Sequence, residues 1–193
     1  MSNSSKEFKE LAHISETLRQ EYLQENIMWI GSPFEWITHM PSRSRGAIGE
    51  KIISMWLASY NFNISRSPDS EADRIIEGKR VEIKFSTLWK NGSYTFQQLR
   101  DQNYNFIIML GLSPDDAHCW VLTKEDIIKL WKHDHIIEGQ HTGREGGDTA
   151  WIHINPNDYE FFKKYGGNLN KALNIISKLT NFYPKSLSEE FDS

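Results

Sequence analysis

The sequence predicts an α/β fold with a mixed central sheet of about five strands, flanked by helices and extended by helical N- and C-terminal elaborations. Three observations lead to this class. Apolar residues recur at helical spacing in residues 6–26 and 46–60. Five short β-prone runs follow between residues 61 and 122, and helical patterns return over residues 123–182. Strands and helices interleave along the chain, which favours one layered core.

Composition favours a single folded domain spanning residues 1–193. Apolar residues make up 38% of the chain, and 7 Trp, 7 Tyr and 10 Phe supply large surfaces to bury. The one cysteine, Cys119, cannot form an internal disulfide, and the first residues do not resemble a signal peptide, so a cytoplasmic location is expected. The apolar run at 106–112 is too short to span a bilayer as a helix, so no membrane association is expected.

The N-terminal segment 6–26 is expected to form an amphipathic helix that serves as a scaffold. Its apolar residues follow spacings of three, four and seven: Phe8, Leu11, Leu18 and Tyr22. Residues 31–45 contain two prolines and several serines, so we expect an irregular connection there. A second helix is predicted from Gly46 to Tyr60, with one apolar side made of Ile48, Ile52, Met55, Trp56 and Ser59.

The predicted strands begin with three runs at residues 61–67, 72–76 and 79–86, and Glu77 and Gly78 form a tight turn between the last two. A short helix is predicted over residues 95–103. A buried strand at 105–112, a turn and a final strand at 118–122 complete the core.

The C-terminal part is expected to be an all-helical support. Thr123 and Asp126 mark the start of a helix through Trp131. Asn155 and Pro156 mark a second helix that ends near Gly166, and a last helix runs over residues 168–182.

The charge of the chain is unevenly distributed. The net charge is -4, yet residues 41–100 hold ten Lys or Arg against six Asp or Glu, and the remainder holds twelve against twenty. A central segment of charge +4 is compatible with a nucleic-acid partner, although scattered surface charge would give the same count.

Glu82 and Lys84 carry the first chemical signal. Side chains alternate along a strand, so both lie on one face, opposite Val81 and Ile83. A hairpin that turns at residues 77–78 would carry Asp73 back towards Glu82. Two carboxylates brought together are stabilised by a cation between them, and carboxylates with water and phosphate oxygens suit Mg²⁺.

Glu50 is a candidate for a third acidic group. It lies on the helix in line with Ile53 and Leu57, which should face the protein interior. A carboxylate on that side needs a partner or a metal ion, unless it reaches the solvent at the helix edge.

These residues resemble the PD-(D/E)XK nuclease superfamily, which includes most type II restriction endonucleases. The stretch A-D-R-I-I-E-G-K-R-V-E-I-K, residues 72–84, is similar to the catalytic hairpin of that superfamily, and G-A-I-G-E-K, residues 46–51, is similar to its helix glutamate. The resemblance implies a restriction-endonuclease-like core at about residues 46–122, between the N-terminal helix 6–26 and a C-terminal helical region 123–182.

The resemblance also implies roles for the individual residues. Asp73, Glu82 and the backbone carbonyl of Ile83 would hold Mg²⁺, and Lys84 would orient or deprotonate the attacking water. The literal Pro-Asp pair of this sequence is Pro68-Asp69, so Asp69 is an alternative to Asp73 as the metal ligand, although the hairpin spacing favours Asp73.

Further residues are candidates for contacts with DNA. By the resemblance, one of Gln97 and Gln98 would contact the scissile strand. Arg43 and Arg45 precede Glu50 and could bind phosphates. The glycine-rich loop 138–149 offers base-reading donors in Gln140, His141 and Arg144. Each of these residues could equally be a solvated surface side chain.

Together with the paired carboxylates, the resemblance implies a Mg²⁺-dependent endonuclease that cleaves double-stranded DNA, of the sequence-specific type II restriction class. A homodimer is compatible with this class, because a symmetric site matches a two-fold protein. Two alternatives remain. One is a repair or junction nuclease of the same superfamily, and the other is a non-catalytic DNA-binding module.

Overall fold

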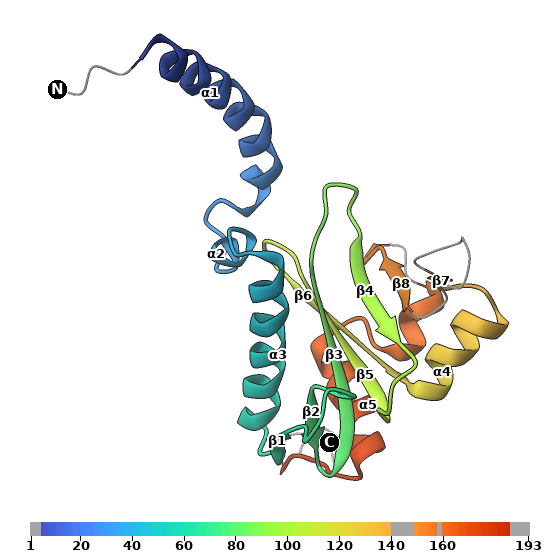
Figure 1. The fold of residues 1–193 in the computed structure, drawn as a ribbon. Coiled ribbons are helices and arrows are strands. Elements are labelled where there is room, and N and C mark those ends of the chain that lie inside the picture. The colour runs from blue at the N-terminus through green and yellow to red at the C-terminus, as the bar shows by residue number, and fades with distance from the viewer. Residues whose placement is uncertain (1–4, 140–148, 158–159, 186–193) are drawn as a thin grey trace.

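The structure is a computed structural model that describes residues 5–139, 149–157 and 160–185 (Figure 1). Its helices are α1 (Lys6–Asn26), α2 (Glu35–Thr38), α3 (Ser42–Ser59), α4 (Lys124–Ile128) and α5 (Leu169–Thr180), with short turns η1 (Ile27–Trp29), η2 (Lys129–His133) and η3 (Glu160–Tyr165). Its strands are β1 (Ile64–Arg66), β2 (Arg74–Ile76), β3 (Lys79–Thr87), β4 (Tyr94–Arg100), β5 (Phe106–Leu112), β6 (Ala117–Thr123), β7 (Glu138–Gly139) and β8 (Thr149–Ile154).

The predicted mixed sheet of five strands is confirmed. The strand order is β1-β2-β3-β5-β6, in which β3 and β5 run parallel and the other neighbours run antiparallel. All seven residues of β5 are buried, as expected for a strand covered on both faces. The predicted turn at 113–116 and the strand that follows it are also present.

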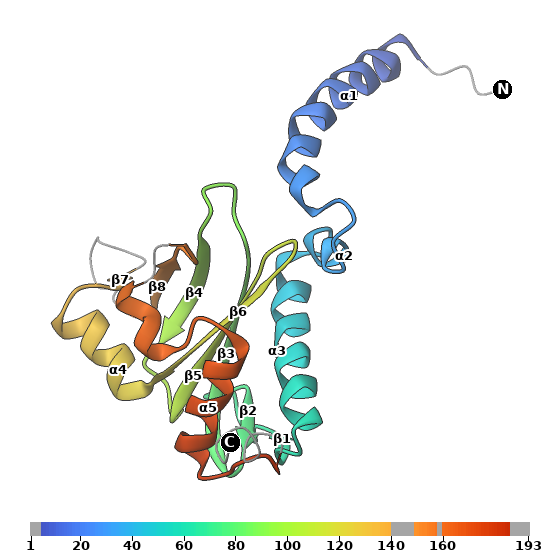
Figure 2. The same ribbon diagram turned by 180° about the vertical axis from the view of Figure 1, so that it is seen from behind.

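Two layers cover the central sheet. On one face, the buried side chains of α3 and α5 pack on the sheet, among them Ile53, Leu57, Leu173 and Ile176. On the other face lies a second, three-stranded sheet of order β4-β8-β7, together with α4. Figure 1 and Figure 2 show α3 beside β3 and the second sheet on the side away from α3.

The helix predicted over residues 95–103 is wrong, because these residues form most of β4 and the bend after it. Tyr94 and Phe96 have alternating positions in the strand, and both rings pack edge-on against Trp120, with centroids 5.9 and 6.1 Å away. This distant aromatic partner stabilises the extended backbone, and a helix would not bring both rings onto it.

The all-helical C-terminal region predicted over 123–182 is also wrong, since it contains β7 and β8. In β8, Ala150, Ile152 and Ile154 are buried at the period of two that is typical of a half-buried strand. The helices predicted around this pair of strands are present in part. Thr123 begins α4 with a capping box to Asp126, and Asn168 begins α5.

The N-terminal helix has the predicted bounds but does not brace the core. Phe8, Leu11 and Leu18 are exposed, and α1 extends away from the rest of the molecule in both views (Figures 1 and 2). The irregular connection predicted over residues 31–45 is wrong, because it contains α2 and the first turn of α3.

The second helix begins at Ser42, directly after Pro41, and its buried face differs from the predicted one. Gly49, Ile53 and Leu57 face the sheet, whereas Met55 is 74% exposed. The orientation expected for Ile53 and Leu57 is therefore confirmed. Among the described residues, none of the helices combines the length and apolar character needed to cross a membrane.

Candidate active site

The β2–β3 hairpin brings the side chains of Asp73 and Glu82 together. Its turn consists of Glu77 and Gly78, which both have positive φ, at 47° and 76°. Such a two-residue turn suits the twist of paired strands. The pairs Ile76↔Lys79, Ile75↔Arg80 and Arg74↔Val81 follow, and Asp73, just before β2, has its carboxyl in hydrogen-bond contact with that of Glu82.

Asp73 is bound to β3 by its backbone and by its carboxylate. Its N–H donates to the Val81 carbonyl at 3.0 Å, and its Oδ2 accepts from the Ile83 N–H at 2.7 Å. The N–H and C=O of one residue point to the same edge of a strand, so the Ile83 carbonyl also faces the Asp73 side. The Asp73 carboxylate thus accepts the Ile83 N–H in place of a backbone carbonyl from a longer β2 strand.

Glu82 is a buried carboxyl that shares its surroundings with Asp73 and Lys84. It is 8% exposed, and the Lys84 Nζ lies 2.7 Å from its Oε1. Burial raises the pKa of Glu82, Lys84 opposes that rise, and repulsion and a hydrogen bond with the Asp73 carboxyl add to it. The lysine therefore compensates the negative charge in part, and an additional cation would compensate it further.

Glu50 reaches the same region from α3. Its Oε2 lies 3.2 Å from the Arg74 guanidinium, which also donates to the Asp73 carbonyl at 2.7 Å and to the Ser54 hydroxyl at 3.2 Å. Burial, followed by the charge of Asp73, raises the pKa of Glu50, although Arg74 and Lys84 oppose this. Glu50 thus has Arg74 as its partner and also lines a cleft beside the hairpin.

A cleft of about 920 Å³ opens where β3 continues beyond its last pair with β2, between α3 and β4. Glu50, Asp73, Ile83 and Lys84 line it, whereas the buried Glu82 does not. Its walls carry Arg43 and Arg45 from the start of α3 and Trp89, Lys90 and Asn91 from the β3–β4 loop. The cleft therefore combines the acidic centre with cationic and aromatic side chains.

Gln97 and Gln98 both line this cleft, although they are neighbours on a strand. Successive strand residues normally point to opposite faces. Here β4 has a bulge, because Phe96 pairs with Ile152 and Leu99 with Ala150, so that two glutamines stand opposite the single Trp151. Gln98 also has a positive φ of 56°. The bulge turns both amides towards the cleft, as bulges near functional sites commonly do.

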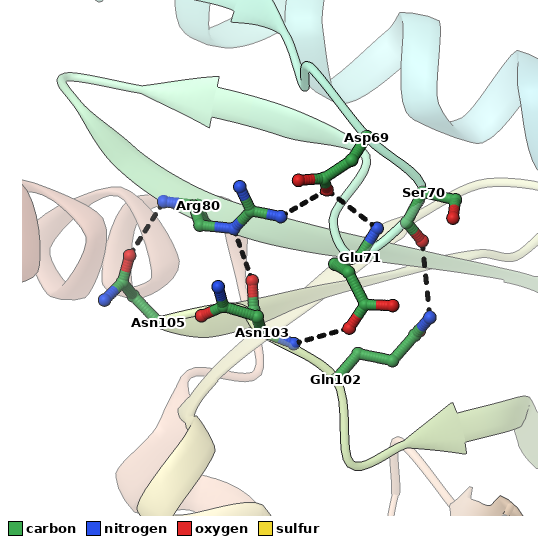
Figure 3. A network of polar contacts seen from close by, with 7 residues as sticks. All are labelled: Asp69, Ser70, Glu71, Arg80, Gln102, Asn103 and Asn105. Atoms are coloured by element: carbon green, nitrogen blue, oxygen red, sulfur yellow. Dashed lines mark hydrogen bonds and ion pairs between the residues drawn. The ribbon is translucent and has the colours of Figure 1, made fainter.

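Asp69 lies in a different network and is not among the cleft-lining residues (Figure 3). It forms an ion pair with Arg80 and accepts the Glu71 N–H at 3.0 Å. The hydrogen bond from Arg80 is the main cause of the lowered pKa of Asp69. Arg80 also donates to the Asn103 carbonyl, so this network ties the loop before β2 to the loop before β5.

Three of the predicted residues lie outside the part of the chain that the structure describes. Two residues near the cleft, in contrast, were not predicted from the sequence. Gln140, His141 and Arg144 lie outside the described residues. Arg74 was missed as the partner of Glu50, although its position next to Asp73 was a usable signal. Trp89 was missed as well, and a tryptophan beside a lysine in a polar loop could have drawn attention to it.

The acidic contribution to the centre is a pair of carboxylates. Within the described ranges, no three His, Cys, Asp or Glu side chains come together closely enough to hold a metal ion. A pair is nevertheless sufficient for Mg²⁺, which usually keeps several waters and binds one or two carboxylates together with substrate phosphates.

No family model matches the sequence, and no curated protein matches it either. Among solved structures, the chain is similar to a bacterial homing endonuclease, I-Ssp6803I, with a TM-score of 0.47 and 15% sequence identity. The alignment covers 79% of this chain and 99% of that one.

Proposed function

We propose that this protein is a Mg²⁺-dependent endonuclease that hydrolyses phosphodiester bonds in double-stranded DNA, a sequence-specific enzyme of the type II restriction class in the PD-(D/E)XK superfamily. One observation carries the proposal. The Asp73 and Glu82 carboxyls come together at a hairpin beside an open cleft that Asp73, Ile83 and Lys84 line, with the Lys84 amine 2.7 Å from Glu82.

The residues at this centre fit a hard divalent cation. Asp73, Glu82 and the Ile83 carbonyl offer oxygen donors at the Asp73 side of β3. Burial, and after it the charge of Asp73, raises the pKa of Glu82 despite the opposing charge of Lys84, so a further cation would stabilise the ionised carboxylate. When bound, Mg²⁺ supplies positive charge for the phosphate and lowers the pKa of a bound water.

Lys84 and Glu50 would act around this cation. The Lys84 amine, on the same strand face as Glu82, orients or deprotonates the attacking water and adds positive charge near the phosphate. Glu50 holds Arg74 at 3.2 Å, and Arg74 holds the Asp73 carbonyl, so Glu50 positions the hairpin against α3. We therefore assign Glu50 a positioning role, in which it acts on the site through Arg74 and Asp73.

The cleft walls supply contacts for DNA. Arg43 and Arg45 offer cations for phosphate oxygens at one side. Gln97 and Gln98 offer amides that can pair with an adenine edge in the major groove. We assign phosphate contacts to the arginines and base contacts to the glutamines.

Lys84→Ala tests the proposal directly. With unmodified plasmid and Mg²⁺, this variant should lose roughly 10²–10³-fold or more of the cleavage rate, because it removes a charge that stabilises the transition state. Its DNA affinity should stay within a few-fold of wild type. Lys51→Ala is the matched control, since Lys51 is an exposed lysine of α3 outside the cleft. Unchanged cleavage by Lys84→Ala would remove the proposed mechanism.

The choice of substrate separates the two alternatives. Discrete plasmid fragments with defined ends indicate a restriction-type enzyme, and cleavage confined to branched or mismatched DNA indicates a repair or junction nuclease. DNA binding without cleavage of any of these substrates, in Mg²⁺ or Mn²⁺, would leave a non-catalytic binding module.

A further inference from the structure

The paired strands β4 and β8 form a ribbon with one buried face and one outer face (Figure 1). On the buried face Phe96 pairs with Ile152, and both belong to the core on that side of the central sheet. The pair Leu99↔Ala150 belongs to the same core. Side chains alternate along a strand, so the residues between these pairs point away from that core. They are Thr95, Gln97, Gln98 and Arg100 on β4 and Thr149, Trp151 and His153 on β8.

The outer face of the ribbon is continuous with the cleft of the candidate active site. Thr95, Gln97 and Gln98 line that cleft. The strand register places His153 beside Thr95, and Trp151 beside the two glutamines. A direct contact joins the strands here, because the Thr95 Oγ1 lies 3.0 Å from the Nδ1 of His153, 58 residues further along the chain. The wall of the cleft therefore extends from β4 onto β8.

The two strands of the ribbon supply hydrogen-bonding and cationic side chains without any carboxylate. Neither β4 nor β8 contains an Asp or a Glu, although the whole chain has 26 of them. Gln98, Arg100 and His153 are exposed, and Gln97 is half-buried. Such a face attracts a polyanion, and it presents the side-chain types that pair with base edges.

His153 is held so that one of its ring nitrogens stays available. Its Nδ1 faces the Thr95 hydroxyl, and its ring meets the Trp151 ring edge-on with centroids 6.2 Å apart. These two contacts fix the plane of the imidazole. The two nitrogens of an imidazole point in different directions, so the Nε2 is directed away from Thr95 and can contact a ligand.

The dimensions of the ribbon suit the major groove of B-form DNA, which admits a two-stranded β-ribbon. Along a strand, the side chains of one face recur about every 6.8 Å. This spacing is about two base-pair steps of 3.4 Å each. The pairs of outer residues from Thr95↔His153 to Arg100↔Thr149 therefore span about four base-pair steps. A-form RNA has a deep, narrow major groove that side chains cannot read, so duplex DNA is the partner that fits.

We propose that the outer face of the β4–β8 ribbon enters the major groove of duplex DNA, where Arg100 and His153 read base edges beside Gln97 and Gln98. This inference rests on the proposed function for its DNA substrate, and it adds two recognition residues to that site. An arginine can donate to both O6 and N7 of guanine, and a histidine nitrogen can donate to a purine N7.

Binding by a cleavage-inactive protein tests the proposal. A tightly bound duplex is selected with Lys84→Ala from a pool of random-sequence duplexes, and affinities are measured by fluorescence anisotropy. The further changes Arg100→Ala and His153→Ala should weaken binding of the selected duplex by roughly tenfold or more relative to the unselected pool. The matched control is His133→Ala with Lys178→Ala, which removes an exposed histidine and an exposed cation outside the ribbon. Unchanged preference for the selected duplex overturns the proposal.

Replacement of one atom in the DNA tests the choice of groove. In a selected duplex built with 7-deazaguanine and 7-deazaadenine, the purines lack the N7 acceptor of the major groove and keep their minor-groove edges. The Lys84→Ala protein should lose roughly tenfold in affinity for this duplex, and the variant that also lacks Arg100 and His153 should lose less. The first measurement uses intact ribbon residues, so it decides the matter even if the multiple variant fails to fold by circular dichroism. No loss for Lys84→Ala, or equal losses for two folded proteins, overturns the proposal.

The outcomes separate this inference from the proposed function. Mg²⁺-dependent cleavage by the wild type, combined with unchanged preference after loss of Arg100 and His153, leaves the nuclease and removes the ribbon. Reduced preference after loss of these two residues, in a protein whose wild type cleaves no DNA, removes the nuclease and leaves the ribbon as a reader of DNA.

Discussion

A Cβ atom on Gly49 would lie 2.3 Å from the Phe85 Cβ, so the backbone of α3 rests directly on a side chain of β3. No residue larger than glycine fits there without displacing the helix or the strand. The next residue along α3 is Glu50, whose carboxylate reaches Arg74 beside Asp73. This close approach therefore sets the distance between the helix and the β2–β3 hairpin.

Gly49→Ala should destabilise the protein, because overpacking of a filled core costs about 1–3 kcal/mol. Gly46→Ala is the control on the same helix: a Cβ there meets nothing within 4 Å, and alanine is the better helix former by up to ~1 kcal/mol. Urea denaturation should therefore move the two midpoints in opposite directions. Equal stability of both variants would contradict the close packing of α3 on β3.

Glu82→Gln should raise stability above pH 4.5 while it abolishes cleavage. The folded protein raises the pKa of Glu82 above its usual value of 4.5, so this group stabilises the fold most at low pH and loses that contribution as pH rises through the folded pKa. Glutamine has no charge to bury. The unfolding midpoint of the variant should thus gain on wild type between pH 4.5 and pH 8 in metal-free buffer. A variant that loses stability over that range would refute the claim that the buried Glu82 carboxylate destabilises the fold.

Asp73→Asn and Asp69→Asn, compared side by side, separate the two candidate metal ligands. Asp73 lines the cleft, whereas Asp69 pairs with Arg80 outside it. We expect Asp73→Asn to lose cleavage by about 10²-fold or more, as removal of a catalytic charge does. Asp69→Asn should keep cleavage within a few-fold. If Asp69→Asn alone is inactive, the hairpin does not carry the metal ligand.

Removal of both glutamine side chains at the β4 bulge should relax sequence preference. A bidentate contact with a base contributes about 1–3 kcal/mol of discrimination, so Gln97→Ala with Gln98→Ala should weaken binding of the cognate site by roughly tenfold or more relative to random DNA. Gln102→Ala is the control, since that amide donates to the Ser70 carbonyl outside the cleft. An unchanged preference would assign base reading to other parts of the chain.

Arg43 and Arg45 should contribute to affinity without regard to sequence. Each phosphate contact adds about 0.9 to the slope of log affinity against log salt, so Arg43→Ala with Arg45→Ala should reduce that slope by about 1.8. Lys178→Ala on α5, an exposed cation outside the cleft, should leave the slope unchanged. Titration by fluorescence anisotropy at several salt concentrations gives the slopes, and equal slopes for all three proteins would exclude phosphate contacts by these arginines.

The sequence by itself determined the β2–β3 hairpin and the mixed sheet of five strands. A two-residue turn at Glu77 and Gly78, flanked by alternating strands, brings the Asp73 carboxyl to Glu82 and Ile83 through geometry that spans about ten residues. Burial of β5 on both faces was readable in the same way, because a continuous apolar run has no polar face to expose. Interactions this local leave few alternative arrangements.

The tertiary structure decided β4, the glutamine pair and the Glu50–Arg74 contact. Residues 95–100 are extended because Trp120 and β8 hold Tyr94 and Phe96 from far along the chain, and the bulge in that pairing turns Gln97 and Gln98 into the cleft. Likewise, the meeting of Glu50 and Arg74 depends on Gly49 lying against Phe85. Packing against distant residues overrides the local secondary-structure preference of a segment. The local sequence pattern does not specify which distant side chain will contact that segment.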